Sequence, residues 1–214
     1  LFEEYNPLLT LPQKLQEAIE VLRQRKTRKI RIGSIDLFTD PDQERKERRY
    51  FSCCASIGVG AMVAEKANRY RKYAGDLPGT LGAIFSSLAS YHPKEITLEI
   101  SGKTMHFERV TNLFIGRTKY IASGLKAPQA IPDEDNRFYI LCVNNLTMRR
   151  LPGLLKMLYS GDFRNSAVMN IQYSDSVSVN ALNQPARIEF DGDAAGYTPC
   201  NIRPASSFLS LIVG

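Results

Sequence analysis

Two carboxylates at the end of one short segment are the residues best placed to do chemistry. Asp191 and Asp193 flank a glycine directly after an alternating strand, 187–190. Every second residue of a strand shares a face, so Ile188 and Phe190 point into a core and the two acids come at the strand's exit. Such a pair can hold a metal ion, orient a hydroxyl group or accept a proton. The competing interpretation is a plain hairpin turn, which Asp-Gly commonly forms and which this segment alone favours.

The other reactive side chains match no common catalytic or metal-binding pattern. The cysteines are an adjacent pair, Cys53 and Cys54, and two distant residues, Cys142 and Cys200. With only two histidines in the chain, this spacing predicts no zinc site. Free thiols in a reducing cytoplasm are the expected state of these cysteines. No Ser/His/Asp or Cys/His constellation is apparent.

The charge balance is basic, with a formal net charge of +6 over 214 residues. Most of the excess comes from 14–49 and 66–72. A basic balance fits nucleic acid, anionic lipid headgroups or nucleotide phosphates. The interleaved aromatic residues of a nucleic-acid module do not accompany it, so we expect no nucleic-acid partner. No run of eighteen apolar residues occurs, which predicts no membrane-spanning helix.

The elements that must position these residues are predicted to form an α+β chain. Apolar residues at helical spacing predict a first helix after a Thr10 cap, and three more helices at 61–73, 81–88 and 151–159. Alternating segments predict about ten strands, at 30–35, 49–57, 96–100, 105–115, 138–143, 167–173, 177–182, 186–190, 200–203 and 208–213. Residues 116–136 are expected to be irregular. The links between the late strands are too short for helical crossovers, so we expect a mainly antiparallel, β-sandwich-like domain with a few peripheral helices.

Two amphipathic segments, 148–159 and 61–73, mix cations with apolar residues. Either could lie on an anionic bilayer, with cations such as Arg149, Arg150 and Lys156 at headgroup level. The favoured alternative is a helix packed on the sheet, because most apolar stripes of this kind face a core.

Four segments are informative as an ordered set. A strand leads into a glycine-started helix over Arg49–Ala61, and 124–130 is a glycine-containing loop that ends in Ala-Pro-Gln-Ala. Asp135 begins a turn before an apolar strand, and Phe190-Asp191-Gly192-Asp193 is followed by Pro199. Together they resemble the C-terminal domain of the diacylglycerol kinase/sphingosine kinase family, most closely the bacterial soluble lipid kinases. The last segment is similar to that family's Asp-Gly-Glu signature.

The resemblance implies a two-domain lipid kinase. Its N-terminal α/β domain holds nucleotide phosphates on the backbone amides of a Gly-Gly-Asp-Gly-Thr motif. That motif is absent from these residues. We therefore expect 1–29 to be a connecting helix from a missing nucleotide-binding domain, and 30–214 to be the β-rich lipid-side domain.

The resemblance also implies a cofactor, partners and a location. ATP is the co-substrate, held mainly by the missing domain, and Mg²⁺ is the cofactor. The implied partners are a lipid substrate, an anionic membrane surface and the chain's own N-terminal domain. A homodimer is a possible assembly. The implied location is cytoplasmic, peripheral to the membrane.

Individual roles carry over by position. Asp193 stands at the family's glutamate, the candidate general base that accepts the proton of the lipid hydroxyl. Asp191, with Gly192, stands at the preceding Asp-Gly, which helps to orient the hydroxyl, the nucleotide or Mg²⁺. Asp135 stands at an aspartate that holds a structural Mg²⁺ together with backbone carbonyls, the hard oxygen ligands that this ion prefers.

Three departures from the family pattern bear on activity. Asp193 is one methylene shorter than glutamate, Asn136 replaces a glycine, and the glycine run before Ala127 is reduced. A carboxylate displaced by an ångström can cost on the order of a hundredfold in rate. The expected function is ATP-dependent phosphorylation of a diacylglycerol- or sphingoid-type hydroxyl, with this fragment inactive alone. The alternative is a non-catalytic lipid-binding or regulatory module on the same fold.

Overall fold

Two compact units divide the chain, and the larger one, Ile32–Ala205, holds the residues of the predicted site. The computed structural model describes residues 11–122, 125–163 and 169–213. The helices are α1 (Leu11–Gln24), α2 (Val59–Ala74), α3 (Asp76–Ser90) and α4 (Leu151–Ser160). The strands are β1 (Thr27–Phe38), β2 (Lys46–Phe51), β3 (Cys54–Gly58), β4 (Lys94–Ile100), β5 (Lys103–Gly116), β6 (Tyr120–Ala122), β7 (Leu125–Lys126), β8 (Phe138–Asn144), β9 (Met169–Ser174), β10 (Val177–Ala181), β11 (Arg187–Phe190) and β12 (Asp193–Ile212).

The smaller unit combines Leu1–Arg31 with Ser206–Gly214. Helix α1 begins at Leu11, directly after the predicted Thr10 cap, which confirms a helix there. Val213 donates its backbone N–H to the Lys26 carbonyl at 2.9 Å. The Arg31 guanidinium lies over the Phe208 ring, 4.4 Å from its centroid. The interpretation of 1–29 as a connector between domains stays a prediction.

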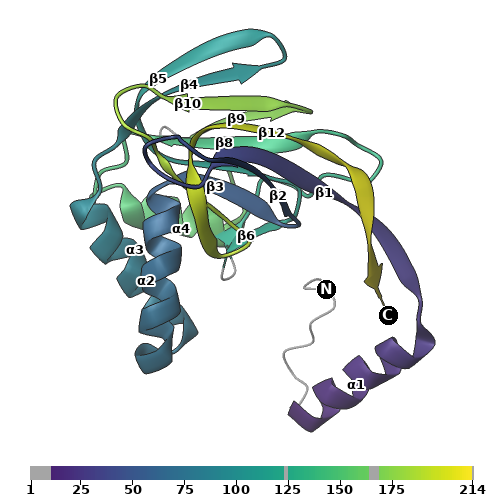
Figure 1. The fold of residues 1–214 in the computed structure, drawn as a ribbon. Helices are drawn as coiled ribbons and strands as arrows, with labels where there is room; N and C mark the ends of the chain where they lie inside the picture. Colours follow the sequence, from purple (N-terminus) through teal and green to yellow (C-terminus); the bar gives the residue numbers. More distant parts are fainter. Residues whose placement is uncertain (1–10, 123–124, 164–168, 214) are drawn as a thin grey trace. The chain divides into compact units, whose positions relative to one another are not determined.

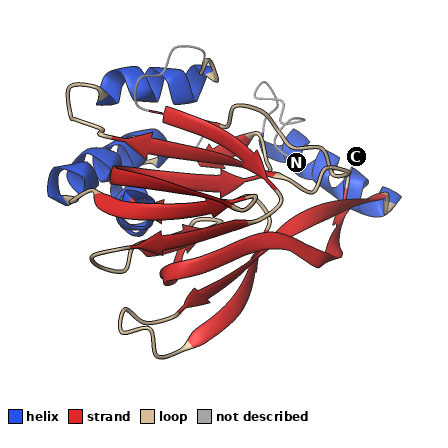
Figure 2. Ribbon diagram, turned by 90° about the horizontal axis from the view of Figure 1, so that it is seen from above, coloured by secondary structure: helices blue, strands red, loops and turns tan. Residues whose placement is uncertain are grey.

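In the larger unit the strands form a ring closed by the last strand. Within the ten-stranded sheet, neighbours follow the order β10-β4-β5-β3-β11-β12, and β12 pairs again with β10. This second pairing joins Cys200 to Val179 and Ile202 to Val177. Every strand pairing whose register is resolved is antiparallel, which confirms the predicted class of fold (Figure 2).

Alternation along the strands separates two apolar clusters. One row of β3, Ala55 and Ile57, faces Ile115 and Leu113 of β5 inside the ring. The opposite face of β5 and β8, with Leu141 and Tyr139, belongs to a second cluster that includes residues of α4. Helices α2, α3 and α4 lie on one side of the strands (Figure 1). Among the described residues no helix is long and apolar enough to cross a bilayer.

Two predicted segments differ from the structure. The strand expected at 49–57 is broken at Ser52 and Cys53, so that it becomes β2 and β3. The residues expected to be irregular, 116–136, contain the small hairpin β6–β7. The break at Ser52 has an identifiable cause in the candidate site.

Candidate functional site

The turn between β11 and β12 carries the two predicted carboxylates. Asp191 and Gly192 have φ angles of 52° and 96°. Glycine adopts this left-handed region without a steric penalty, and Asp tolerates it better than most residues do. Asp193 begins β12 opposite Phe190, and both acidic residues are exposed. The tight turn and the acid pair, posed as alternatives by the sequence, are present together.

The Asp191 carboxylate binds the break between β2 and β3. Its Oδ2 accepts hydrogen bonds from Ser52, from the backbone N–H at 2.7 Å and from the hydroxyl at 3.0 Å. Its Oδ1 accepts the Cys53 N–H at 2.8 Å. The Asp191 N–H in turn donates to the Cys54 carbonyl at 3.2 Å. Three donors therefore occupy this carboxylate, and they fix the path of the chain from β2 into β3.

Asp193 differs from Asp191 although it lies only two residues away. Within the described part of the chain, its carboxylate makes no hydrogen bond or ion pair. Its oxygens therefore remain available to accept a proton or a hydrogen bond from a ligand. The general-base role of Asp193 stays a prediction, which this availability supports.

A third acid, Glu189, lies beside the pair and was not among the predicted site residues. It is only 9% exposed, and Gly192 donates its backbone N–H to Glu189 Oε2 at 3.2 Å. Burial raises the pKa of Glu189 to about 7, and the negative charges of Asp191, Cys53 and Asp193 act in the same direction. Alternation in β11 places Glu189 on the face away from the ring core. A residue on that face would be expected to be exposed to solvent, but α2 packs against β11 and covers it.

An apolar pocket of about 150 Å³ reaches this turn. Its walls come from α2, α3, α4 and the outer face of the sheet, with Val63, Ile84, Phe114, Leu154 and Leu158 among them. Part of its polar lining is the turn itself, through Glu189, Asp191 and Gly192. Asn68 of α2 lines the pocket too and donates to the Gly192 carbonyl at 3.4 Å. The apolar walls could bind a hydrocarbon chain, and the polar lining could bind a polar group at its end.

A buried polar pair continues the polar lining of this pocket. Glu189 lies opposite Ser56 in the register of β11 and β3. The Ser56 hydroxyl and the Asn112 amide are linked by a hydrogen bond of 2.9 Å, with the amide nitrogen as donor. Asn112 Oδ1 also accepts the Gly60 N–H at 2.8 Å, near the start of α2. These bonds hold α2 on the sheet, so the pocket has a fixed polar side.

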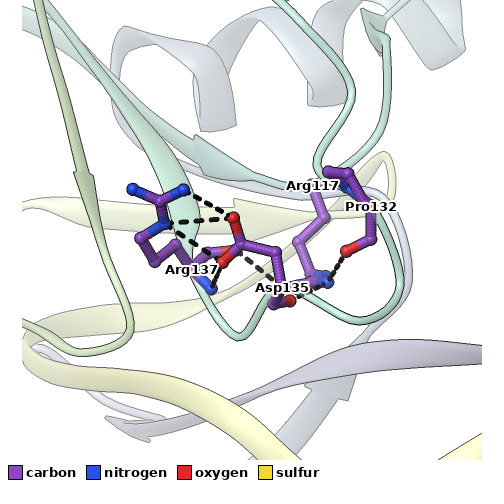
Figure 3. Close-up of polar contacts among 4 residues, drawn as sticks. All are labelled: Arg117, Pro132, Asp135 and Arg137. Carbon is purple, nitrogen blue, oxygen red and sulfur yellow. Dashed lines mark hydrogen bonds and ion pairs between the residues drawn. The ribbon is translucent and has the colours of Figure 1, made fainter.

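The loop that contains Asp135 is organised by an arginine (Figure 3). Arg117, only 5% exposed, donates to three backbone carbonyls: to Arg137 at 2.6 Å, to Pro132 at 2.8 Å and to Asp135 at 2.6 Å. Its guanidinium carbon also lies 5.7 Å from the centroid of the Phe138 ring. Carbonyls that converge in this way are the usual neighbours of a cation, and here the cation is a side chain.

The Asp135 carboxylate is likewise occupied. Arg137 donates its backbone N–H to Oδ1 at 2.8 Å, and its guanidinium binds both oxygens, with Nη2 2.7 Å from Oδ2. These hydrogen bonds lower the pKa of Asp135 to about 2. The donor set expected for a structural Mg²⁺ is thus held by two guanidinium groups, and the arrangement does not fit the ion. Nor do the described residues contain a cluster of three or more Asp, Glu, His or Cys side chains suited to a metal.

The amphipathic segments are helices, and their apolar faces are packed. Leu151, Leu154 and Leu158 of α4 are buried, and Arg150 and Lys156 are exposed. In α2 the buried residues are Val59, Ala61 and Ala67. The favoured interpretation, helices packed on the sheet, is confirmed for these apolar faces. Contact between the outward cations and a membrane stays a prediction.

Comparison with protein families identifies the domain. Residues 53–213 match the family model described as the YegS C-terminal NAD kinase β-sandwich-like domain. The match covers most of the chain, and the chain therefore belongs to this family. The resemblance noted from the four sequence segments is confirmed at this level. No curated protein matches the chain.

Solved structures agree on the fold. A Bacillus anthracis str. Sterne protein provisionally described as a diacylglycerol kinase superposes with a TM-score of 0.67 at 14% identity, covering 95% of this chain and 63% of its own. A second structure, described as a diacylglycerol kinase of the same organism, gives 0.58 at 11% identity, with 95% and 60% covered. The chain thus spans less than two thirds of the length of these proteins, and identity this low shows the fold alone.

Proposed function

We propose that this domain forms the lipid side of a lipid kinase, and that the intact protein transfers the γ-phosphoryl group of ATP to a lipid hydroxyl. Membership of a family of kinase-type domains supports the use of ATP. The observation that carries the proposal is the apolar pocket whose lining includes the acidic turn at Glu189, Asp191 and Gly192. The domain alone is inactive in this proposal, because it contains no phosphate-binding glycine motif.

The pocket suits a hydrocarbon chain. Each buried methylene contributes about 0.8 kcal/mol to binding, so even part of an acyl or sphingoid tail would be held firmly. Apolar walls discriminate weakly between tails, by about 1–3 kcal/mol for a missing methylene. The tail therefore provides affinity, and the choice among lipids falls to the polar lining.

The turn would supply the proton acceptor. Asp193, which is exposed and free of partners among the described residues, accepts the hydroxyl proton as the hydroxyl oxygen bonds to the γ-phosphorus. The bond from that phosphorus to the β–γ bridging oxygen breaks, and ADP leaves. Mg²⁺ bound with the nucleotide would neutralise charge on the phosphates. Asp191 acts indirectly, because its bonds to Ser52 and Cys53 hold the turn that presents Asp193.

A peripheral position at an anionic membrane belongs to the same proposal. Exposed cations on α2 and α4, among them Arg69, Lys72 and Lys156, would lie at headgroup level. Sedimentation of the protein with liposomes, with and without anionic lipid and at low and high salt, tests this contact. Binding that does not depend on the anionic lipid content would remove the membrane contact from the proposal.

The test of the central claim is phosphate transfer by the full-length protein. Labelled ATP and a mixture of diacylglycerol and sphingoid lipids are supplied, and label in the lipid fraction is measured. We expect transfer by the natural protein and a loss of about a hundredfold or more in Asp193→Ala, the range for a missing general base. Asp193→Glu is the matched variant that keeps the carboxylate. Unchanged activity in Asp193→Ala would remove the residue from its role.

A second candidate function is supported by two observations. Three donors occupy the Asp191 carboxylate, and Asp193 is one methylene shorter than the glutamate of related domains. A lipid-binding module without catalysis would share these features. Tight lipid binding by the full-length protein, together with no label in any lipid, would favour this module over the kinase.

A further inference from the structure

Glu189 is a buried acid that the proposed phosphoryl transfer does not use. It lies at the centre of a pairing between β11 and β3, lines the apolar pocket and is 9% exposed. The only hydrogen-bond donor to its carboxylate among the described residues is the Gly192 N–H, at 3.2 Å. A buried carboxylate can accept several hydrogen bonds, so most of its capacity is unused.

The charges around Glu189 are negative rather than compensating. Asp191, Cys53 and Asp193 are the groups whose charge acts on it, and each opposes its ionisation. Two cations are engaged elsewhere. Arg187, two residues before Glu189, pairs with Glu65 at 3.0 Å, and Arg71, which lines the pocket, pairs with Asp76 at 3.0 Å. Within the described residues Glu189 therefore has no counter-charge, an arrangement that favours either the protonated acid or a carboxylate paired with a cationic ligand.

We propose that Glu189 recognises a protonated amine, so that the pocket selects a lipid whose headgroup carries an ammonium beside the reacting hydroxyl. This inference rests on the proposed lipid-binding function and narrows its substrate class to amino alcohols. The tail occupies the apolar walls, and the ammonium donates to the Glu189 carboxylate. The adjacent hydroxyl then lies on the side of the turn, where Asp193 follows four residues later in the chain.

A neutral headgroup would gain less from the same residue. An uncharged diol can meet Glu189 only by a neutral hydrogen bond to the protonated acid, or by leaving a carboxylate poorly compensated. A charge-assisted hydrogen bond is roughly twice as strong as a neutral one. The contrast predicts a preference for the amine of tenfold or more at equal tail length.

The test is a comparison of two lipids with one tail, 2-aminooctadecan-1-ol and octadecane-1,2-diol. Their dissociation constants are measured with the full-length protein, with Glu189→Gln, and with Asp175→Asn, an exposed acid that does not line the pocket. We expect the natural protein and Asp175→Asn to prefer the amine by tenfold or more. Glu189→Gln should bind the two lipids within about twofold of each other.

Thermal melting of each variant shows whether it is folded, and Ala64→Phe narrows the pocket as a further control. Equal binding of both lipids by the natural protein, abolished by Ala64→Phe, overturns the amine preference and leaves the lipid pocket intact. A preference that survives in folded Glu189→Gln also overturns it. No binding of either lipid overturns this inference together with the proposed function.

Discussion

Two acidic loops of the same unit differ in whether a cation balances their charge. At the loop of Asp135, Arg117 binds three backbone carbonyls and Arg137 binds the Asp135 carboxylate. At the turn between β11 and β12, backbone N–H groups and one hydroxyl bind Asp191 and Glu189, and the described residues place no cation on them. The Asp135 carboxylate of the first loop is balanced by an arginine of the chain itself, whereas the second loop retains negative charge next to a pocket. Unbalanced charge beside a cavity makes the second loop the candidate ligand site.

The largest effect is expected from removing Arg117. Arg117→Ala removes a buried guanidinium and leaves three partly buried carbonyls without this donor, and we expect a loss of about 4 kcal/mol in the free energy of unfolding. Denaturant unfolding of the full-length protein measures it. Arg117→Lys keeps the charge but not the planar guanidinium. Its stability should therefore lie between those of the natural protein and Arg117→Ala.

Thermal melting distinguishes a loop held by arginine from one held by a metal ion. Millimolar Mg²⁺ should leave the melting temperature of the natural protein unchanged in the absence of nucleotide. A clear rise with Mg²⁺ that is lost in Asp135→Asn would show that an ion does bind this loop.

The next effect concerns Glu189 and pH. Its pKa rises from 4.5 to about 7 on folding, so the folded state holds its proton more tightly. Stability therefore falls as pH rises from below 4.5 through 7, by at most about 3 kcal/mol. Glu189→Gln should be more stable than the natural protein at pH 8, and this gain should vanish near pH 4. A gain that is equal at both pH values would contradict the assigned pKa.

A smaller effect is expected at Asp191. Asp191→Ala removes three accepted hydrogen bonds and places alanine at a φ of 52°, for a cost of about 2 kcal/mol. Asp191→Asn keeps one acceptor oxygen and tolerates this φ, so it should lose about half as much. Equal stability of the natural protein and Asp191→Ala would deny the carboxylate its structural role.

The smallest effect is expected at Arg137. Its ion pair with Asp135 lies at the surface, with 57% of the Arg137 side chain exposed. Exposed pairs contribute between zero and about 1 kcal/mol, and salt screens them. Arg137→Ala should therefore cost less than 1 kcal/mol by denaturant unfolding, and still less at 1 M salt. A loss as large as that of Arg117→Ala would show that the two arginines act as one unit.

The sequence predicted the class of fold because alternation and short links are local signals. It also placed Asp191 and Asp193 on one turn, since an Asp-Gly dipeptide after a strand leaves few other conformations. The break between β2 and β3 was missed, because its cause is a carboxylate 138 residues away from Cys53. The alternation of apolar and polar residues indicates which side chains share a face of a strand. It does not indicate a distant residue that breaks the strand by hydrogen bonding to it.

Glu189 and Arg117 were missed for a related reason. Alternation correctly placed Glu189 away from the ring core, but only the packing of α2 decides that this face is buried. Arg117 binds carbonyls, and every residue has one, so no side-chain pattern marks its partners. Both residues become informative only when burial and charge are known together.

The second pairing of β12 has a consequence for how this domain is made. Strand β10 gains one of its two neighbours only when Cys200–Ile202 arrives, close to the end of the chain. Until then its backbone N–H and C=O groups form an open edge, the kind of surface on which chains aggregate. Nearly all of this domain must therefore be synthesised before the edge of β10 is covered and protected from pairing with other chains. A chain cut shortly before residue 200 should be recovered as aggregate rather than as a smaller folded protein.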